Sequence, residues 1–314
     1  MADVKDSSIL IQDVETKNIM TKSTLPVGGY SVNPYVGCTH GCKYCYASFM
    51  KRFTGHTEPW GTFLDVKHWP AIKNPQKYKG QRVVIGSVTD GYLPQEAQFQ
   101  NTRKLLEQLR GSEAEILICT KSDLVIRDID LLKELGKVTV SWSINTLDED
   151  FKNDMDNAVS IKRRLDAMKQ VYDAGIRTVC FIAPVFPGIT DFEAIFHQVR
   201  NQCDLIWLEN LNLRGGFKKD ILDYIRKKHP DLVPLYKISD EMGMEFATAS
   251  LHNSFYFVEA KNIIHDRPMV AKNFENLVNE LLRSNSPKKW FRAYFNHGLI
   301  NYIYGQKRLL PCDM

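Results

Sequence analysis

The sequence predicts an α/β fold built from repeated βαβ units, and two patterns support this prediction. Short apolar runs rich in β-branched residues recur along the chain, as is typical of buried parallel strands. Helical stretches that end at a glycine separate several of these runs, which gives the strand–helix–strand order of a parallel sheet. The runs are Arg82–Ile85, Ile116–Cys119, Val138–Trp142, Thr178–Ile182 and Leu205–Leu208.

Three helical stretches fit between these strands. The apolar residues of Ser160–Ala174 recur at helical spacing on one face, and Gly175 follows as a C-terminal cap. Asn101–Arg110 and Asp128–Leu135 repeat the arrangement, because a glycine and then an apolar run follow each of them. The middle of the chain therefore reads as one continuous parallel α/β unit.

Both ends of the chain lack this alternation of strands and helices. Residues 1–28 are polar and weakly patterned, so we expect an N-terminal extension. From about Ser250 the strand–helix alternation is lost and the composition becomes aromatic and basic. We divide the chain into an extension at 1–28, a barrel domain at 29–250 and a C-terminal extension at 251–314 that closes the barrel.

Composition narrows the class of protein. Of the 314 residues, 44% are hydrophobic and 25% are charged, which is ordinary for a globular protein. The net charge of +4 is too small to indicate nucleic-acid binding by itself. No run approaches the roughly 20 apolar residues that span a bilayer, and no basic-then-apolar segment opens the chain. We expect a cytoplasmic protein without a membrane partner.

Three of the seven cysteines lie in one short segment, which argues against a disulfide framework. Cys38, Cys42 and Cys45 are spaced too tightly to be separate core residues, and a glycine before each of the first two lets the backbone wrap closely. The thiolates therefore converge on one metal centre. A zinc ion would need a fourth ligand such as His40 or His56. A [4Fe-4S] cluster held by three cysteines would leave one iron open for a substrate or cofactor.

The spacing C-x3-C-x2-C, with Tyr44 directly before the last cysteine, resembles the signature of the radical S-adenosylmethionine (SAM) superfamily. The resemblance implies that Cys38, Cys42 and Cys45 hold a [4Fe-4S] cluster whose open iron binds SAM. It also implies reductive cleavage of SAM to methionine and a 5'-deoxyadenosyl radical, with an external electron donor of the flavodoxin or ferredoxin type. The fold implied is a partial (β/α)6 barrel, like an incomplete TIM barrel.

Longer strings resemble the branch of the superfamily that includes spore photoproduct lyase. They cover residues 30–213 and include the following: "NPYVGCTHGCKYCYA", "TDGYLPQE", "TKSDLVIRDIDLL", "SINT" and "AGIRTVCFIAPVFPGITD". The chain also resembles a group of paired, mobile-element-associated radical enzymes, which implies a second radical SAM protein as a partner.

Polar residues follow the predicted strands, where ligands of parallel α/β folds bind. Lys121 carries a cation suited to the methionyl carboxylate, and the resemblance favours that role. Hydroxyl and amide groups at the other strand ends can bond the amino group and ribose of SAM, or can satisfy local backbone instead. The expected SAM contacts are Tyr44, Thr89, Asp90, Lys121, Ser122, Ser143, Asn145 and Arg164.

Two of the expected functional residues rest mainly on the resemblance. Related proteins carry an arginine near SAM, and Arg164 fits that position better than Arg163, although a helix-face arginine paired with Asp166 is the ordinary alternative. Tyr46 follows the last cluster cysteine, where the lyase branch has a tyrosine assigned to radical relay. A packing role is the alternative for Tyr46.

One departure from the lyase concerns the hydrogen donor. The lyase has a hydrogen-donating cysteine at the position of Ser87, and a serine O–H is a poor hydrogen-atom donor, so we expect no spore photoproduct repair. Cys312, near the chain end, is the catalytic thiol candidate, with an unconstrained terminal cysteine as the alternative. Cys119, Cys180 and Cys203 fit small buried hydrophobes.

The C-terminal segment at 288–308 interleaves basic and aromatic residues. Such a segment can stack flipped or single-stranded bases, or can form an amphipathic helix that closes the barrel. The sequence thus predicts a radical SAM enzyme that abstracts hydrogen from an unidentified substrate, with nucleic acid or a nucleotide preferred. The alternatives are modification of a peptide or small metabolite, and a non-catalytic Fe-S protein that binds or senses.

Overall fold

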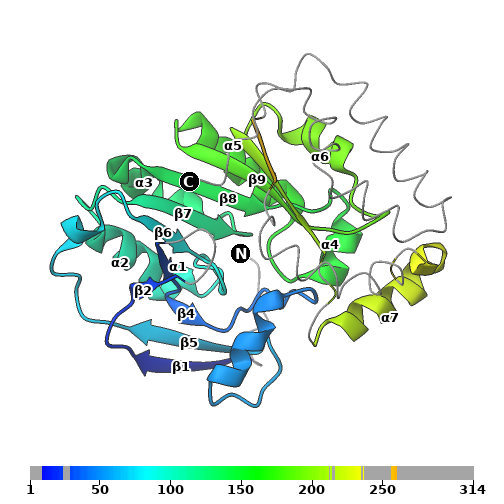
Figure 1. The fold of residues 1–314 in the computed structure, drawn as a ribbon, viewed down its shortest axis with the longest axis horizontal. Coiled ribbons are helices and arrows are strands. Elements are labelled where there is room, and N and C mark those ends of the chain that lie inside the picture. Colours follow the sequence, from blue (N-terminus) through cyan, green and yellow to red (C-terminus); the bar gives the residue numbers. More distant parts are fainter. Residues whose placement is uncertain are drawn as a thin grey trace.

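The computed structural model forms an open, strongly twisted sheet with helices along one side and a smaller sheet beneath it (Figure 1). The structure describes residues 9–23, 29–211, 213, 216–234, 236 and 256–259, with only the backbone of 192, 208, 210 and 256–259. The predicted C-terminal residues Cys312 and 288–308 lie outside the described residues.

The large sheet has the strand order β11-β10-β9-β8-β7-β6-β3-β2. The neighbours from β3 to β10 pair in parallel, whereas β2 and β11 pair antiparallel at the two edges. The strands are β2 (Thr21–Lys22), β3 (Tyr30–Val32), β6 (Arg82–Ile85), β7 (Glu115–Thr120), β8 (Val138–Ser143), β9 (Arg177–Val185), β10 (Leu205–Asn210) and β11 (Tyr256–Glu259). The six parallel strands confirm the partial (β/α)6 architecture.

The second sheet has the order β1-β5-β4 and lies below the first in Figure 1. Strands β1 (Leu10–Glu15) and β5 (Phe63–His68) pair in parallel, and β4 (Tyr35–Val36) pairs antiparallel with β5. Part of the segment expected to be an extension thus forms strands, since β1 joins this sheet and β2 joins the large one. The turn after β4 leads directly into the cysteine segment.

Helices connect successive parallel strands. The α-helices are α1 (Glu96–Phe99), α2 (Asn101–Gln108), α3 (Ile129–Leu135), α4 (Glu149–Met155), α5 (Ile161–Asp173), α6 (Phe192–Val199) and α7 (Lys218–Lys228). The 3-10 helices are η1 (Tyr46–Phe53), η2 (Pro75–Tyr78), η3 (Leu124–Asp128) and η4 (Pro230–Leu232). Helices α2, α3 and α5 match the three stretches that the sequence predicts, within two residues at each end.

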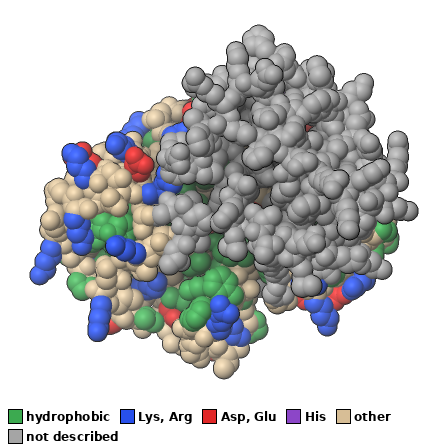
Figure 2. All heavy atoms as spheres, in the orientation of Figure 1, with side chains coloured by type: hydrophobic (Ala, Val, Ile, Leu, Met, Phe, Trp, Pro, Cys, Tyr) green, Lys and Arg blue, Asp and Glu red, His purple; other side chains and the backbone are tan. Residues whose placement is uncertain are grey.

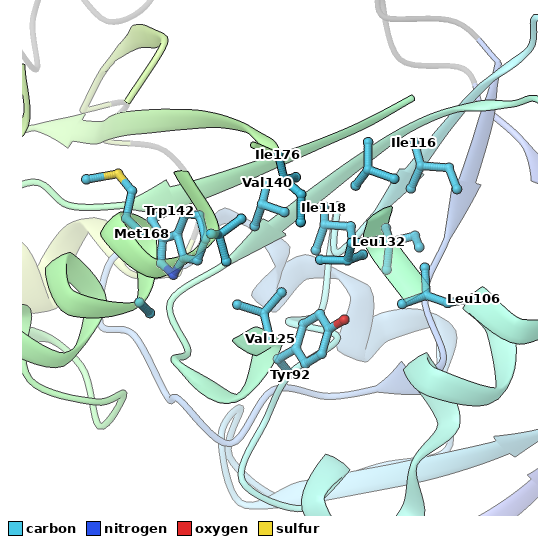
Figure 3. Close-up of a cluster of buried hydrophobic side chains, with 14 of the residues drawn as sticks. Tyr92, Leu106, Ile116, Ile118, Val125, Leu132, Val140, Trp142, Met168 and Ile176 are labelled. Atoms are coloured by element: carbon cyan, nitrogen blue, oxygen red, sulfur yellow. The ribbon is translucent and has the colours of Figure 1, made fainter. Parts of the chain in front are cut away.

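The main core lies between one face of the sheet and the helices. Ile118 of β7 and Trp142 of β8 are fully buried there, against Leu106 of α2 and Met168 of α5 (Figure 3). Because side chains alternate across a strand, the residues between these core positions project from the opposite, inner face. The inner face leads to the carboxyl ends of the strands, where ligands of parallel α/β folds bind.

Strand alternation corrects one expectation about the cysteines. Cys180 and Cys203 are buried in the helix-side core, as small hydrophobes would be. Cys119 is only partly buried and lies on the inner face, one residue after the core residue Ile118. An apolar run does not reveal by itself which face each of its residues occupies, so the sequence left this point unresolved.

Candidate functional site

The cysteine segment forms a tight loop between β4 and η1. The N–H of Gly41 donates to the carbonyl of Cys38 at 3.1 Å, and the N–H of Cys45 donates to the carbonyl of Cys42 at 3.1 Å. Two further backbone bonds, from Lys43 to Met155 and from Asn157 to His40, anchor the loop to the chain around α4. The three thiols are therefore presented by a loop that is held at both ends.

Glycines make this close wrapping possible. Gly37 has φ +85°, and a Cβ atom there would lie 2.4 Å from the carbonyl oxygen of Phe63. Gly61 has φ +101°, and its Cβ would lie 2.9 Å from the Cα of Gly41. Both distances are shorter than real Cβ contacts, so side chains are excluded at these positions. The loop and the segment before β5 thus touch backbone to backbone.

The thiols share one partly enclosed environment. Burial raises the pKa of Cys38, and the neighbouring Cys42 and Cys45 raise it further. Burial also raises the pKa of Cys42 to about 12, whereas the Lys121 ammonium acts in the opposite direction. A bound metal would remove the thiol proton outright, so a metal held by these cysteines would offset the effect of burial on their ionisation.

The cysteine loop does not form a site for a single metal ion within the described part of the chain. Among the described residues, no three His, Cys, Asp or Glu side chains are grouped tightly enough to hold one metal ion. A tetrahedral zinc site, with Zn–S bonds of about 2.3 Å, needs sulfur atoms about 4 Å apart. Cysteines that hold an iron–sulfur cluster bind different irons and lie farther apart. His40 and His56, the two zinc-ligand candidates, are both paired with carboxylates.

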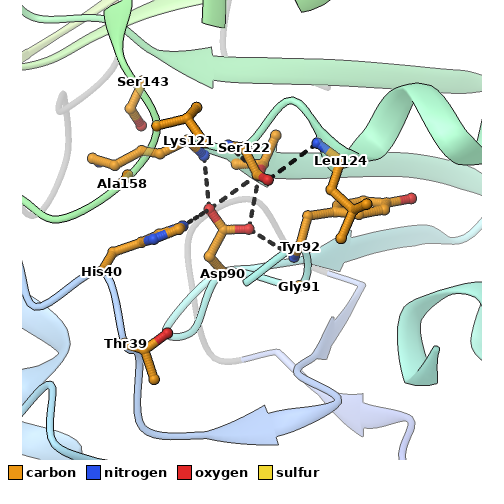
Figure 4. A network of polar contacts seen from close by, with 12 residues as sticks. Thr39, His40, Asp90, Gly91, Tyr92, Lys121, Ser122, Leu124, Ser143 and Ala158 are labelled. Atoms are coloured by element: carbon orange, nitrogen blue, oxygen red, sulfur yellow. Dashed lines mark hydrogen bonds and ion pairs between the residues drawn. The ribbon is translucent and has the colours of Figure 1, made fainter. Parts of the chain in front are cut away.

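Asp90 ties the cysteine loop to the ends of two strands (Figure 4). Its carboxylate lies 3.0 Å from Nε2 of His40, which belongs to the loop, and accepts the backbone N–H of Lys121 at 2.7 Å. It also accepts the Thr120 hydroxyl and the N–H of Tyr92. Burial opposes its ionisation, but His40 and the N–H donors hold the pKa of Asp90 below its usual value. Protein groups thus occupy both carboxylate oxygens.

Lys121 places a positive charge beside the thiols. Its Nζ lies 5.5 Å from the centroid of the Tyr44 ring, and its charge lowers the pKa of Cys42 and Cys45 against the effect of burial. Within the described part of the chain, no carboxylate lies at ion-pair distance from this ammonium. An ammonium whose backbone is fixed, and which has no ion-pair partner among the described residues, is suited to an anionic ligand.

Tyr44 and Arg164 belong to a buried network centred on Asp156. The Tyr44 hydroxyl donates to Asp156 at 3.2 Å, and Nη2 of Arg164 donates to the other carboxylate oxygen at 2.6 Å. Arg164 also donates to the carbonyls of Val159 and Ser143, and it is fully buried. Through Asp156 and the carbonyl of Ser143, the guanidinium therefore connects Tyr44 of the cysteine loop to the end of β8.

The remaining strand-end residues differ in their burial and in their hydrogen-bond partners. The Ser122 hydroxyl accepts the N–H of Leu124 at 3.1 Å, which caps the turn after β7. Thr89 is buried, and Ser143 is partly exposed at the end of β8. Among the described residues, the amide nitrogen of Asn145 is one of eight buried side-chain polar atoms without a hydrogen-bond partner. A buried N–H group without a partner costs about 1–3 kcal/mol, so this amide can donate to a ligand at little further cost.

Tyr46 stands at the rim of the site. The residue is 55% exposed, and its hydroxyl donates to the carbonyl of Ser87. The Ser87 hydroxyl is itself bonded to Ser31 and accepts the amide of Asn33 at 3.1 Å. The serine at the lyase's thiol position is thus engaged in hydrogen bonds among β3, β6 and η1.

Glu209 is a candidate site residue that the sequence reasoning missed. It lies at the end of β10, within an irregularity of the pairing with β9 between Leu208 and Asn210. Such bulges re-aim side chains near active sites. Burial raises the pKa of Glu209 to about 7, although Lys121 acts against the shift. The signal in the sequence was a carboxylate directly after the last apolar run.

Comparisons with known proteins show which family the chain resembles. The model of the Radical SAM superfamily matches residues 32–198. An uncharacterized protein of Methanocaldococcus jannaschii is 33% identical over 228 residues, which are 72% of this chain and 86% of that relative. The Radical SAM Nalpha-GlyT isomerase of Pseudomonas phage M6 is 28% identical over 178 residues, which are 55% of this chain and 35% of that enzyme.

A solved structure of mutant spore photoproduct lyase with bound AdoMet and dinucleoside spore photoproduct is also similar. It is 20% identical, has a TM-score of 0.48, and the match covers 63% of this chain and 58% of that one. No described helix is long and apolar enough to cross a membrane. Since the family model spans more than half of the chain and the archaeal relative aligns over most of its own length, this protein belongs to the radical SAM superfamily, as the cysteine spacing predicted.

Proposed function

We propose that this enzyme binds a [4Fe-4S] cluster through Cys38, Cys42 and Cys45 and cleaves SAM reductively beside it. When bound, the cluster and SAM together supply a 5'-deoxyadenosyl radical, which abstracts a hydrogen atom from the substrate. The observation that carries the proposal is the position of the Lys121 ammonium, which has no ion-pair partner among the described residues, beside the loop that carries the three thiols.

The residues around the loop have separable roles in this proposal. Lys121 binds the carboxylate of SAM, and the unpartnered amide of Asn145 donates to a SAM oxygen or nitrogen. Asp90 and Arg164 position the site rather than touch SAM, because protein groups already occupy their polar atoms. Tyr44 packs beneath the Lys121 ammonium, and Ser122 caps the turn that presents it.

We infer that the substrate is a nucleotide or nucleic acid and that the reaction is a rearrangement. The phage relative named Radical SAM Nalpha-GlyT isomerase supports a reaction in which substrate and product have the same atoms. An isomerisation returns the abstracted hydrogen to the product, so it requires no net oxidant. The hydrogen-bonded Ser87 hydroxyl supports a reaction other than spore photoproduct repair.

The proposal is tested by anaerobic reconstitution. We expect about four irons and four sulfides per chain and an absorption band that bleaches on reduction. With dithionite and SAM, the protein should form 5'-deoxyadenosine, measured by chromatography and mass spectrometry. The variant with Cys38, Cys42 and Cys45 all changed to Ala should do neither. If the protein only binds or senses, the reconstituted wild type should hold iron and make no 5'-deoxyadenosine.

Substrate class is tested with deuterated candidates. Perdeuterated thymidine, a single-stranded oligonucleotide containing it, and a deuterated peptide are each incubated with enzyme, SAM and dithionite. Transfer of deuterium into 5'-deoxyadenosine from the nucleoside or oligonucleotide supports the proposal. Transfer only from the peptide contradicts the substrate class while leaving the radical chemistry intact.

A further inference from the structure

The inner face of the sheet carries a row of side chains that have no role in the proposed binding of SAM. The strand register places Ser143 of β8 beside Phe181 of β9, and Phe181 beside Trp207 of β10. Side chains paired in this way across parallel strands project from the same face of a sheet. Their strand neighbours Trp142 and Ile206 lie in the helix-side core, so this row projects to the inner face.

Two aromatic rings of this row form an apolar surface. The rings of Phe181 and Trp207 meet edge to face, with centroids 6.0 Å apart and planes 80° apart. Both residues are only partly buried, although they lie on strands inside the sheet. Two rings at nearly a right angle offer a flat face and an adjoining wall, and this shape fits a planar ring of a ligand.

A carboxyl group stands next to these rings. Glu209 follows Trp207 by two residues on β10, at the irregularity in the pairing with β9. Its charge raises the pKa of Tyr46 and of Cys119, so the carboxyl group also lies near η1 and β7. The described residues include no hydrogen-bond or ion-pair partner for it. A partly buried polar group without a partner costs free energy, which a ligand that bonds it would offset.

A second polar group on this face also lacks a partner. The hydroxyl of Ser141 is buried, and no described residue bonds it. Ser141 alternates along β8 with the helix-side core residues Val140 and Trp142, and it pairs in register with Cys119 on the inner face. Unused hydrogen-bonding capacity beside apolar rings is typical of a small-molecule site.

The protonation state of Glu209 indicates what it can bond. Burial raises the pKa of Glu209 to about 7, although the nearby Lys121 ammonium acts against this shift. A large share of the carboxyl groups therefore holds its proton at neutral pH. In that form the group has one O–H donor beside one C=O acceptor. It then complements a flat edge that presents an acceptor beside a donor.

A nucleobase has such an edge, because in thymine the N3–H donor lies beside the O4 acceptor on the same side of the ring. A peptide group in the chain does not, because its N–H and C=O point in opposite directions across a trans amide. The neutral carboxyl group and the aromatic rings therefore favour a base over a peptide backbone.

The visible outer face does not offer an equivalent site. Figure 2 shows Lys and Arg side chains scattered over the described part of this face, rather than gathered into one patch. Contacts from such a surface to phosphate groups would carry no information about the base. We therefore expect recognition of the base from groups on the inner face.

We propose that a nucleobase of the substrate binds on this inner face, with its ring against Phe181 and Trp207 and its edge bonded to Glu209. This inference rests on the proposed function, which takes a nucleotide or nucleic acid as the substrate. Flipped and single-stranded bases are recognised by stacking on aromatic rings and by hydrogen bonds to one edge. Glu209 is thus a specificity-determining residue that contacts the substrate and not SAM.

The test measures equilibrium binding without turnover. Two fluorescent single-stranded pentanucleotides carry thymine or N3-methylthymine at the centre and abasic sites elsewhere. Each is titrated with the reconstituted enzyme in the presence of SAM and without a reductant, and fluorescence anisotropy gives the Kd. The methyl group removes the N3–H donor and blocks the edge, so the Kd of the wild type should be roughly five- to a hundredfold higher for the methylated probe.

Two variants of Glu209 identify the group that reads the edge. Glu209→Gln keeps one donor beside one acceptor, so it should bind the thymine probe as the wild type does and still reject the methylated probe. Glu209→Leu removes both groups, so it should no longer distinguish the two probes. Glu193→Leu, at an exposed carboxylate on α6, is the matched control and should behave as the wild type. Bound iron and the Kd for SAM are measured in every protein, so that incomplete loading is recognised.

Two results would overturn the inference. If the wild type does not distinguish the probes, or if Glu209→Leu distinguishes them equally well, Glu209 does not contact the base edge. If Glu209→Gln loses as much affinity for the thymine probe as Glu209→Leu, the ligand requires a negative charge, as a cationic group would. The proposed function fails separately, because its loss appears as absence of 5'-deoxyadenosine when dithionite is added to the wild type with SAM.

Discussion

Lys121 is the residue on which the cofactor chemistry depends most directly. Its backbone N–H is fixed by Asp90 while its ammonium has no described carboxylate partner. Lys121→Met keeps the length of the side chain and removes the charge. A lost charge-assisted hydrogen bond costs about 1.5–3 kcal/mol, so the Kd for SAM should rise roughly ten- to a hundredfold.

Titration calorimetry on the reconstituted protein measures this change. Lys162→Met, on the exposed face of α5, is the control and should bind SAM normally. Iron content should be the same in both variants. Equal affinities for SAM would show that Lys121 does not contact the cofactor.

The two consecutive arginines of α5 should behave very differently. Arg163 is 59% exposed in its side chain and pairs with Asp123, whereas Arg164 is fully buried on Asp156. Removing one member of a buried pair costs about 3–5 kcal/mol, while an exposed pair contributes at most about 1 kcal/mol. Denaturant unfolding should therefore show a large loss for Arg164→Ala and a small one for Arg163→Ala. Similar losses would contradict the buried network.

Because of Glu209, we expect the free energy of unfolding to depend on pH. Burial raises its pKa from 4.5 to about 7, so the folded protein holds a proton that the unfolded chain releases near pH 4.5. The free energy of unfolding is unaffected below that pH and falls as the pH rises towards 7, and the full penalty is present above 7. Glu209→Gln removes the penalty, so it should stabilise the protein at pH 8 by up to about 3 kcal/mol and have little effect at pH 4.5.

Chemical unfolding at several pH values tests this prediction. Glu193→Gln, an exposed carboxylate on α6, is the control and should show no such trend. A constant difference between Glu209→Gln and the wild type from pH 4.5 to 8 would mean that the carboxylate is solvated in the folded protein.

Among the elements, the cysteine loop depends on contact between two backbones. Gly61→Ala would place a Cβ 2.9 Å from the Cα of Gly41 at a left-handed φ, so the loop must open. We expect a large loss of bound iron after reconstitution, with the circular dichroism spectrum preserved. Gly175→Ala is the control, because it has a similar φ and open space around its Cβ. It should lower stability by about 1 kcal/mol and leave the iron content unchanged.

The sequence was most informative where one pattern repeats within a single element. Apolar β-branched runs located β6 to β10, and glycines located the ends of α2, α3 and α5, because both signals are local. It did not locate β1, whose pairing with β5 joins segments about fifty residues apart. For the same reason, the sequence could not show that the amide nitrogen of Asn145 lacks a hydrogen-bond partner among the described residues whereas both oxygens of Asp90 accept hydrogen bonds. Whether a polar side chain is already bonded depends on neighbours that lie far away in the sequence.

At the scale of the whole molecule, the sheet has no exposed parallel edge among its described strands. β2 covers β3 antiparallel on one side, and β11 covers β10 antiparallel on the other. A free edge strand invites pairing with other chains, so these short strands protect an open barrel from aggregation. β11 comes from residues 256–259, which the sequence assigned to the C-terminal extension, and it lies beside the strand that carries Glu209.

The carboxylate of Asp90 also gives the site a thermodynamic linkage. One of its oxygens lies against His40 of the loop that presents the thiols, and the same oxygen accepts the N–H of Lys121. If the loop rearranges when a metal binds, Asp90 connects that change directly to the residue proposed to hold SAM. Linkage between two ligands is reciprocal, so if the cluster raises the affinity for SAM by some factor, SAM raises the retention of the cluster by the same factor. Under the proposed function, the protein would therefore keep its cluster most firmly when SAM is abundant.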